Sequence, residues 1–108
     1  MGAGWVSAML RRLDHAVDIW QRSEPRLGTF ERRPSEQASE QLRFTPYPFE
    51  DVGWMCSQSD PTLYLFSSDY PHAEGGRDPI GRFERVLDER DKPGFYATNA
   101  REWLGITG

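Results

Sequence analysis

A dense apolar run that leads directly into a polar, glycine-rich loop constrains this 108-residue chain more than any other feature. Residues 62–66, Thr-Leu-Tyr-Leu-Phe, combine β-branched, aromatic and aliphatic side chains without a clean polar/apolar alternation. Such a run is typical of a strand buried on both faces, as in a parallel sheet. The loop that follows, residues 67–78, begins with Ser-Ser-Asp-Tyr-Pro-His and ends at a strong helix start, Asp78-Pro79.

Helical patterns surround this run. Apolar residues at spacings of three and four predict an amphipathic helix over residues 5–20, closed by Pro25. Residues 31–41 have no apolar face and are either a short solvated helix with Pro34 in its first turn or a loop. The remaining expected elements are a weak strand at residues 42–45, a short helix near residues 49–56, a helix over residues 79–87 and a last short helix over residues 95–104.

This order of elements predicts the fold class. Strands that alternate with helices indicate βαβ units and parallel pairing, so we expect an α/β protein that is rich in helix. The length allows one domain at most and is too short for a complete (β/α)₈ barrel.

Composition excludes several classes of function. With 17 acidic and 13 basic side chains, the formal net charge is −4, which argues against a nucleic-acid partner. No run of 18 apolar residues predicts a membrane span, and the apolar N-terminus precedes its arginines, the wrong order for a signal peptide. A single cysteine, Cys56, forms no internal disulfide and fits a reducing cytoplasm; a buried inert thiol is its favoured interpretation.

The loop after residues 62–66 contains the candidate site. In parallel α/β proteins ligands bind at the carboxyl ends of the strands, so an acid just beyond a buried strand points toward the site. Asp69 is therefore the best candidate for a metal ligand or general base, and His72 and Glu74 follow in the same loop. The alternative is an ordinary turn, in which Asp69 caps local amides and Pro71 stiffens the backbone.

Several motifs together resemble one known family. They are residues 65–75, Leu-Phe-Ser-Ser-Asp-Tyr-Pro-His-Ala-Glu-Gly, then Asp78-Pro79 and Phe83, the tail Phe-Tyr-Ala-Thr-Asn-Ala at 95–100 with Leu104-Gly105, and shorter matches at residues 2–6, 12–14 and 33–35. The set resembles the amidohydrolase-related family, in the branch of aminocarboxymuconate-semialdehyde decarboxylase-like metal-dependent hydrolases and decarboxylases. The resemblance extends over nearly the whole chain.

The resemblance implies the C-terminal part of a (β/α)₈ TIM barrel, with residues 42–45 as strand seven and residues 62–66 as strand eight. It implies a divalent metal, commonly zinc, and small carboxylated or aromatic substrates. Asp69 corresponds to the family's strand-eight aspartate, a metal ligand and partner of the metal-bound water. His72 and Glu74 belong to the matching loop, where a role in loop shape or substrate contact is implied.

The family's other metal ligands, on earlier strands, have no counterpart in the chain. A catalytic zinc usually has three protein ligands, so one aspartate is not expected to hold the metal stably. We therefore expect residues 1–108 to be a single partial domain, truncated or internally started and inactive alone. We also expect marginal stability or self-association through exposed barrel edges. The alternative is a non-catalytic interaction module that associates through its aromatic helix, residues 5–20, although core packing is the favoured role of that apolar stripe.

Overall fold

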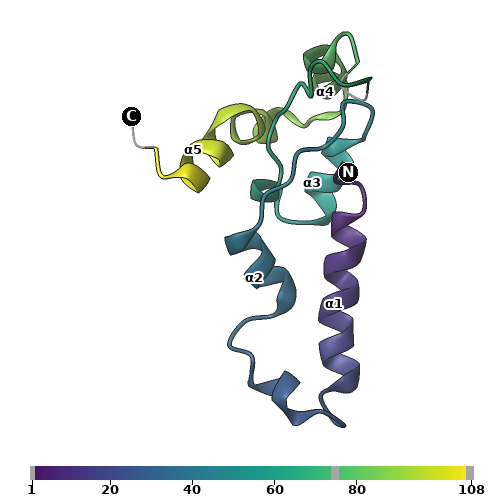
Figure 1. Cartoon of the computed structure of the whole chain (residues 1–108), viewed down its shortest axis with the longest axis vertical. Coiled ribbons are helices and arrows are strands. Elements are labelled where there is room, and N and C mark those ends of the chain that lie inside the picture. Colours follow the sequence, from purple (N-terminus) through teal and green to yellow (C-terminus); the bar gives the residue numbers. More distant parts are fainter. Residues whose placement is uncertain (1, 74–75, 107–108) are drawn as a thin grey trace. The chain divides into compact units, whose positions relative to one another are not determined.

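A computed structural model describes residues 2–73 and 76–106 of the chain. It contains two compact units, of which one is Trp5–Leu42 and the other joins Met1–Gly4 to Arg43–Gly108. Figure 1 shows the helices of both units. The expectation of one partial domain over residues 1–108 stays a prediction.

The Trp5–Leu42 unit is a pair of helices with a turn between them. The long helix α1 spans Val6–Trp20, a 3₁₀ turn, η1, spans Pro25–Thr29, and α2 spans Pro34–Gln41. The amphipathic helix predicted over residues 5–20 is therefore confirmed, and of the two alternatives for residues 31–41 the helix that starts at Pro34 is the observed one.

Polar bonds tie α1 to α2. The Asp14 carboxylate accepts hydrogen bonds from the Ser35 amide at 2.9 Å and the Ser35 hydroxyl at 2.6 Å. The Arg33 guanidinium forms a two-pronged pair with the Asp18 carboxylate, at 3.1 and 3.0 Å. Both acids of α1 are thus satisfied by the start of α2, which places α2 alongside α1 (Figure 1).

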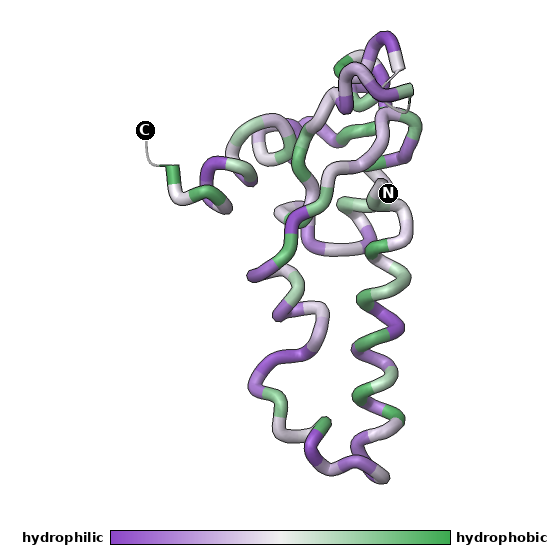
Figure 2. The backbone as a smooth tube through the Cα atoms, viewed as in Figure 1, coloured by the Kyte–Doolittle hydropathy of each residue, from purple (hydrophilic) through white to green (hydrophobic). Residues whose placement is uncertain are grey.

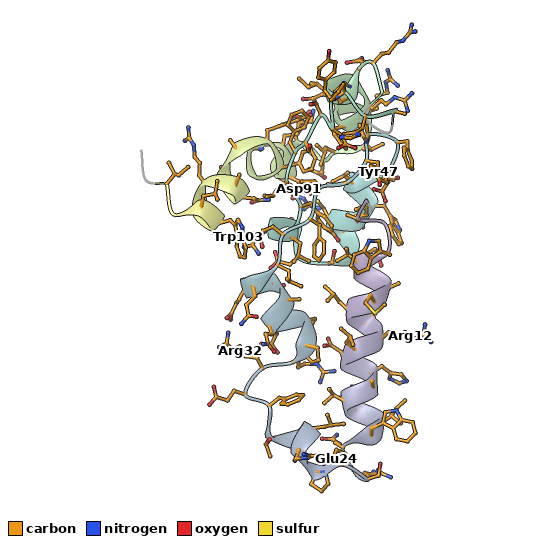
Figure 3. The ribbon with its side chains drawn as sticks, in the orientation of Figure 1. Arg12, Glu24, Arg32, Tyr47, Asp91 and Trp103 are labelled. Carbon is orange, nitrogen blue, oxygen red and sulfur yellow. The ribbon has the colours of Figure 1, made fainter. Side chains whose placement is uncertain are left out.

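α1 carries more apolar surface than this unit covers. Hydrophobic residues recur along the length of α1 (Figure 2). The side chain of Arg12 projects on the side of α1 away from α2 (Figure 3). At 100° per residue, positions 5, 9, 13 and 20 lie within an arc of about 80°. Their side chains are exposed, from 42% for Trp5 to 59% for Trp20. We call this set, Trp5, Met9, Leu13 and Trp20, the α1 stripe.

The other unit consists of short helices joined by loops. They are α3 (Val52–Gln58), the 3₁₀ turn η2 (Pro61–Leu63), α4 (Pro79–Val86), the 3₁₀ turn η4 (Glu89–Asp91), the π-helical turn η5 (Gly94–Thr98) and α5 (Asn99–Leu104). The helix predicted to start at Pro79 is confirmed, with Asp78 as its cap: the Asp78 carboxylate accepts from the Gly81 amide at 3.0 Å. Asp51 caps α3 in the same way, through the Trp54 amide.

Aromatic side chains form the centre of this unit. Tyr64, Phe83 and Phe95 are almost completely buried, together with Val52, Met55 and Leu63. The ring of Phe66 packs at 5.8 Å from Phe83 and at 6.1 Å from Phe95, in edge-on geometry. Such aromatic contacts add to the stabilisation that burial provides.

Glu50 anchors the N-terminal segment to this unit. Its carboxylate accepts hydrogen bonds from the amides of Ala3 at 3.0 Å, Gly4 at 2.5 Å and Tyr47 at 2.8 Å. A Cβ on Gly4 would lie 2.5 Å from a carboxylate oxygen of Glu50, so a larger residue there would displace this carboxylate.

The predicted α/β class, with a (β/α)₈ fragment and strands at residues 42–45 and 62–66, is wrong. Within the described residues the regular structure is helical, and the two segments meet only in an isolated parallel bridge between Phe44 and Tyr64. Its hydrogen bonds run from Phe44 N to Leu63 O at 2.7 Å and from Leu65 N to Phe44 O at 2.9 Å.

The local surroundings explain why no sheet develops from this bridge. A lone pair of strands is marginal in water, and the pairing here is confined between proline-containing turns, with Pro61 in η2 and Pro46 after residue 45. The far side of residues 64–66 bonds to helical residues, because the Tyr64 carbonyl accepts from Asn99 and the Phe66 amide donates to Phe95. Leu63 and Tyr64 are buried as predicted, whereas Thr62, Leu65 and Phe66 are only half-buried.

In the described part of the chain, none of the helices combines the length and apolar character that a bilayer crossing requires.

Candidate functional site

The candidate loop starts where the buried segment ends. Tyr64 is fully buried and Phe66 half-buried, and the Phe66 amide donates to the Phe95 carbonyl at 3.0 Å. Residues Ser67–Asp69 remain half-buried, and the chain becomes exposed from Tyr70 onward within the described part of the loop. The loop therefore begins at a hydrogen-bonded residue, but not at the carboxyl end of a parallel strand, on which its choice from the sequence depended.

Asp69 lies at the turn of this loop. Its backbone has φ of 57°, in the left-handed region that Asp tolerates better than most residues with a Cβ. Its amide donates to the Ser67 hydroxyl at 3.2 Å, and its carbonyl accepts from the His72 amide at 2.8 Å. The Asp69–His72 turn is thus closed by its own hydrogen bonds.

The carboxylate of Asp69 is available for a ligand. It is half-buried, and among the described residues no side chain or amide donates to it. The cap role that the alternative interpretation gave to the Asp69 side chain is therefore not seen there. A half-buried carboxylate can act as an oxygen ligand for a cation or as a proton acceptor.

Of the other two predicted loop residues, the structure describes His72 but not Glu74. His72 is exposed and contributes its backbone amide to the turn, while Tyr70 between them is 86% exposed. Glu74 lies outside the described residues. The assignment of Asp69, His72 and Glu74 as site residues stays a prediction.

The potential metal-binding side chains of the described residues are dispersed. Across residues 2–73 and 76–106, no group of three or more His, Cys, Asp or Glu side chains is placed to hold an ion. A zinc site of the expected kind needs about three protein ligands. The described residues therefore do not make a metal centre by themselves.

Cys56 is unsuited to nucleophilic chemistry. Its side chain is buried on α3, and burial, followed by the nearby charges of Asp91 and Asp60, raises the thiol pKa to about 12. At neutral pH the thiol is protonated, and only the thiolate attacks electrophiles.

A separate hollow of about 280 Å³ lies within the Trp5–Leu42 unit, between α1, η1 and α2. Its lining includes Val17, Leu27 and Phe30 and charges of both signs. Because the Arg33–Asp18 pair lies in this lining, two of those charges neutralise each other.

Comparison with solved structures gives this geometry a context. The chain is similar to an amidohydrolase. The crystal structure of an amidohydrolase from Mycobacterium avium subsp. paratuberculosis K-10 matches 96% of the chain with a TM-score of 0.73 and 26% sequence identity. The chain spans only 26% of the length of that protein. No family model matches the sequence, and no curated protein matches it.

The resemblance inferred from the sequence is thus supported at the level of an amidohydrolase neighbour. The match runs over almost the whole chain, as the distributed motifs predicted, and not only over the loop.

Sequence reasoning did not find the role of Asn99. Its side-chain amide is buried and donates to two backbone carbonyls, Pro61 at 3.1 Å and Tyr64 at 3.0 Å. The signal was present, because Asn99 occupies an apolar-face position of a helical pattern with Phe95 and Trp103. A polar side chain in such a position requires a hydrogen-bond partner.

Proposed function

We propose that this chain supplies part of the active site of a metal-dependent amidohydrolase-type enzyme. The observation that carries the proposal is the match of 96% of the chain to an amidohydrolase at a TM-score of 0.73. The reaction is hydrolysis, or decarboxylation of a related substrate, and the substrate is a small carboxylated or aromatic molecule.

The contribution of this chain is the carboxylate of Asp69. Its half-buried position and its lack of a partner among the described residues support that role. The remaining ligands of a divalent metal, with zinc as our choice, come from a polypeptide segment outside this set of residues. The chain alone is inactive in this proposal, because one carboxylate does not make a three-ligand site.

A graft tests the proposal. Residues 2–106 replace the matched part of the mycobacterial amidohydrolase, and the metal content of the purified hybrid is measured by mass spectrometry. Asp69→Asn is expected to lower the bound metal at least about tenfold, since loss of a ligand or of its support typically costs that much affinity. Asp88→Asn is the matched control, because Asp88 caps η4 through the Arg90 amide and Asn is an equally good cap. A hybrid that binds metal equally with and without Asp69→Asn would exclude Asp69 as a ligand.

A second candidate function rests on the α1 stripe. Four large apolar side chains of one helix face are 42–59% exposed, and contiguous apolar surface commonly marks an interface. In this candidate two copies of the chain associate through α1 without catalysis. Sedimentation equilibrium distinguishes it: Trp20→Ser would shift a dimer toward monomer, whereas the exposed control Leu104→Ser would leave the mass unchanged. A monodisperse monomer of the unmodified chain would contradict this candidate.

A further inference from the structure

Three hydrogen bonds join the C-terminal helical segment to the stretch that leads into the Asp69 loop. The Asn99 side-chain amide donates to the carbonyls of Pro61 and Tyr64, at 3.1 and 3.0 Å. Two residues later, the Phe66 amide donates to the Phe95 carbonyl at 3.0 Å. Residues 61, 64 and 66 are therefore all held by the segment that contains η5 and the start of α5.

This connection is buried and closely packed. Asn99 is 7% exposed and Phe95 2%, so their polar groups have no ready exchange with water. A Cβ on Gly94 would lie 2.9 Å from the Asn99 side-chain oxygen, so a larger residue at position 94 would displace this amide. A buried hydrogen bond of this kind is costly to leave unmade.

Between residues 67 and 73, the described part of the loop nearest Phe66, the hydrogen bonds are of a different kind. In the described residues 67–73, the hydrogen bonds stay within the loop, from Asp69 N to Ser67 Oγ, from Tyr70 N to Ser68 Oγ and from His72 N to Asp69 O. Such bonds fix the shape of the turn but not its place on the protein. On the N-terminal side of the loop, its place is set by Phe66, whose ring also packs against Phe83, Phe95 and Tyr96.

We propose that Asn99 is a positioning residue for Asp69, acting through the Pro61–Tyr64–Phe66 backbone. Asn99 touches neither the carboxylate nor a substrate. It fixes the point from which the self-contained Asp69 turn projects. The value of this coupling to catalysis rests on the proposed function, but the coupling itself requires neither metal nor substrate.

Amide hydrogen exchange in the unmodified and Asn99→Ala chains tests the proposal. The amides followed by NMR are Phe66, bonded to Phe95, and His72, bonded to Asp69, with the chemical shift of Asp69 as a third readout. Val52→Ala is the matched control, because Val52 is fully buried on α3 and its truncation weakens the same unit away from the Asn99 bonds. Both variants are compared at equal global stability, set with urea.

We expect Asn99→Ala to accelerate exchange at Phe66 by about tenfold beyond Val52→Ala, as the loss of a buried hydrogen bond predicts, and to change the chemical shift of Asp69. The His72 amide, bonded within the self-closed turn, is expected to change little. If Asn99→Ala does not fold, Gly94→Ala displaces the same amide while keeping its donors and is expected to act in the same direction. An exchange rate at the Phe66 amide within about twofold of the rate in Val52→Ala would overturn the proposal and leave Asn99 a purely structural residue.

The outcome is separable from the fate of the proposed function. Failure of the exchange experiment rejects the coupling even if Asp69→Asn empties the metal site of the hybrid. Conversely, the exchange experiment can succeed while Asp69→Asn leaves the metal content of the hybrid unchanged. That pair of results would keep the coupling and reject the proposed function.

Discussion

At the scale of single residues, the left-handed backbone of Asp69 is the most telling detail. A φ of 57° costs most side chains about 1–2 kcal/mol, and Asp and Asn adopt it more readily than most residues with a Cβ. An aspartate placed in this conformation is consistent with either a turn residue or a site residue, and stability measurements separate the two contributions.

Asp69→Asn is expected to change the free energy of unfolding by less than about 0.5 kcal/mol, because Asn tolerates the same backbone and the carboxylate has no described partner to lose. Asp69→Ala is expected to cost about 1 kcal/mol from backbone strain alone. Urea unfolding of the two variants checks this. Equal destabilisation by Asn and Ala would show that the carboxylate itself supports the fold.

Asp14 predicts a pH dependence for the pairing of α1 with α2. Burial raises its pKa, but hydrogen bonds from the Ser35 hydroxyl and amide and the charge of Arg33 outweigh it, so the net shift is below the ordinary value of 3.8. A lowered pKa in the folded state means that the charged form stabilises the fold above pH 3.8. That stabilisation is lost as the pH falls through the lowered pKa.

We therefore expect the Ser35 amide resonance to titrate with a midpoint below pH 3.8, and the pairing of the helices to weaken there. Ser35→Ala removes one of the two Ser35 bonds and should move the Asp14 midpoint upward. A midpoint at or above 3.8 in the unmodified chain would be inconsistent with the Asp14–Ser35 bonds.

At the scale of elements, α3 and α4 approach as closely as their backbones allow. A Cβ on Gly53 would lie 1.8 Å from the Val86 carbonyl oxygen, and backbone cannot move aside as a flexible side chain can. Gly53 is therefore required by packing rather than by its φ.

Gly53→Ala is expected to destabilise the chain by about 1–3 kcal/mol through overpacking. Gly28→Ala is the control, because its Cβ would meet only the end of the Gln21 side chain at an ordinary 3.5 Å. Thermal unfolding followed by circular dichroism checks the difference. Comparable midpoints for the two variants would show that α3 and α4 can separate at little cost.

The elements also show how far sequence reasoning reaches. The 3.6-residue periodicity of α1 and the Asp78-Pro79 start of α4 are local signals, and both helices were predicted from them. The prediction of a strand at residues 62–66 was wrong because strand formation depends on neighbouring segments, which the sequence of residues 62–66 does not specify. Its apolar character predicted the burial of Leu63 and Tyr64, yet the bonds of Tyr64 and Phe66 go to Asn99 and Phe95.

In the candidate site, too, local features could be predicted from the sequence and long-range contacts could not. The loop that contains Asp69 followed from local pattern and is seen as a self-closed turn. The choice of Asp69 as a site residue also relied on a parallel strand at residues 62–66, which forms only an isolated bridge in the described chain. The Asn99 bonds join residues 35 and 38 positions apart, and such long-range pairing leaves little trace in a single sequence.

At the scale of the whole molecule, the central fact is that the chain corresponds to only part of the amidohydrolase that it matches. The chain matches an amidohydrolase over 96% of its own length but only 26% of that protein's length. In our proposal the chain therefore carries one site carboxylate, Asp69, and depends on other residues for the rest. The missing three-ligand cluster in the described residues is what makes this dependence testable.

Equilibrium dialysis of the purified chain against Zn²⁺, with the bound metal counted by mass spectrometry, tests this claim most directly. The account predicts well under one zinc per chain at micromolar free metal, and no change on Asp69→Asn. One tightly held zinc per chain that Asp69→Asn releases would contradict it, because the chain would then contain a complete metal site of its own.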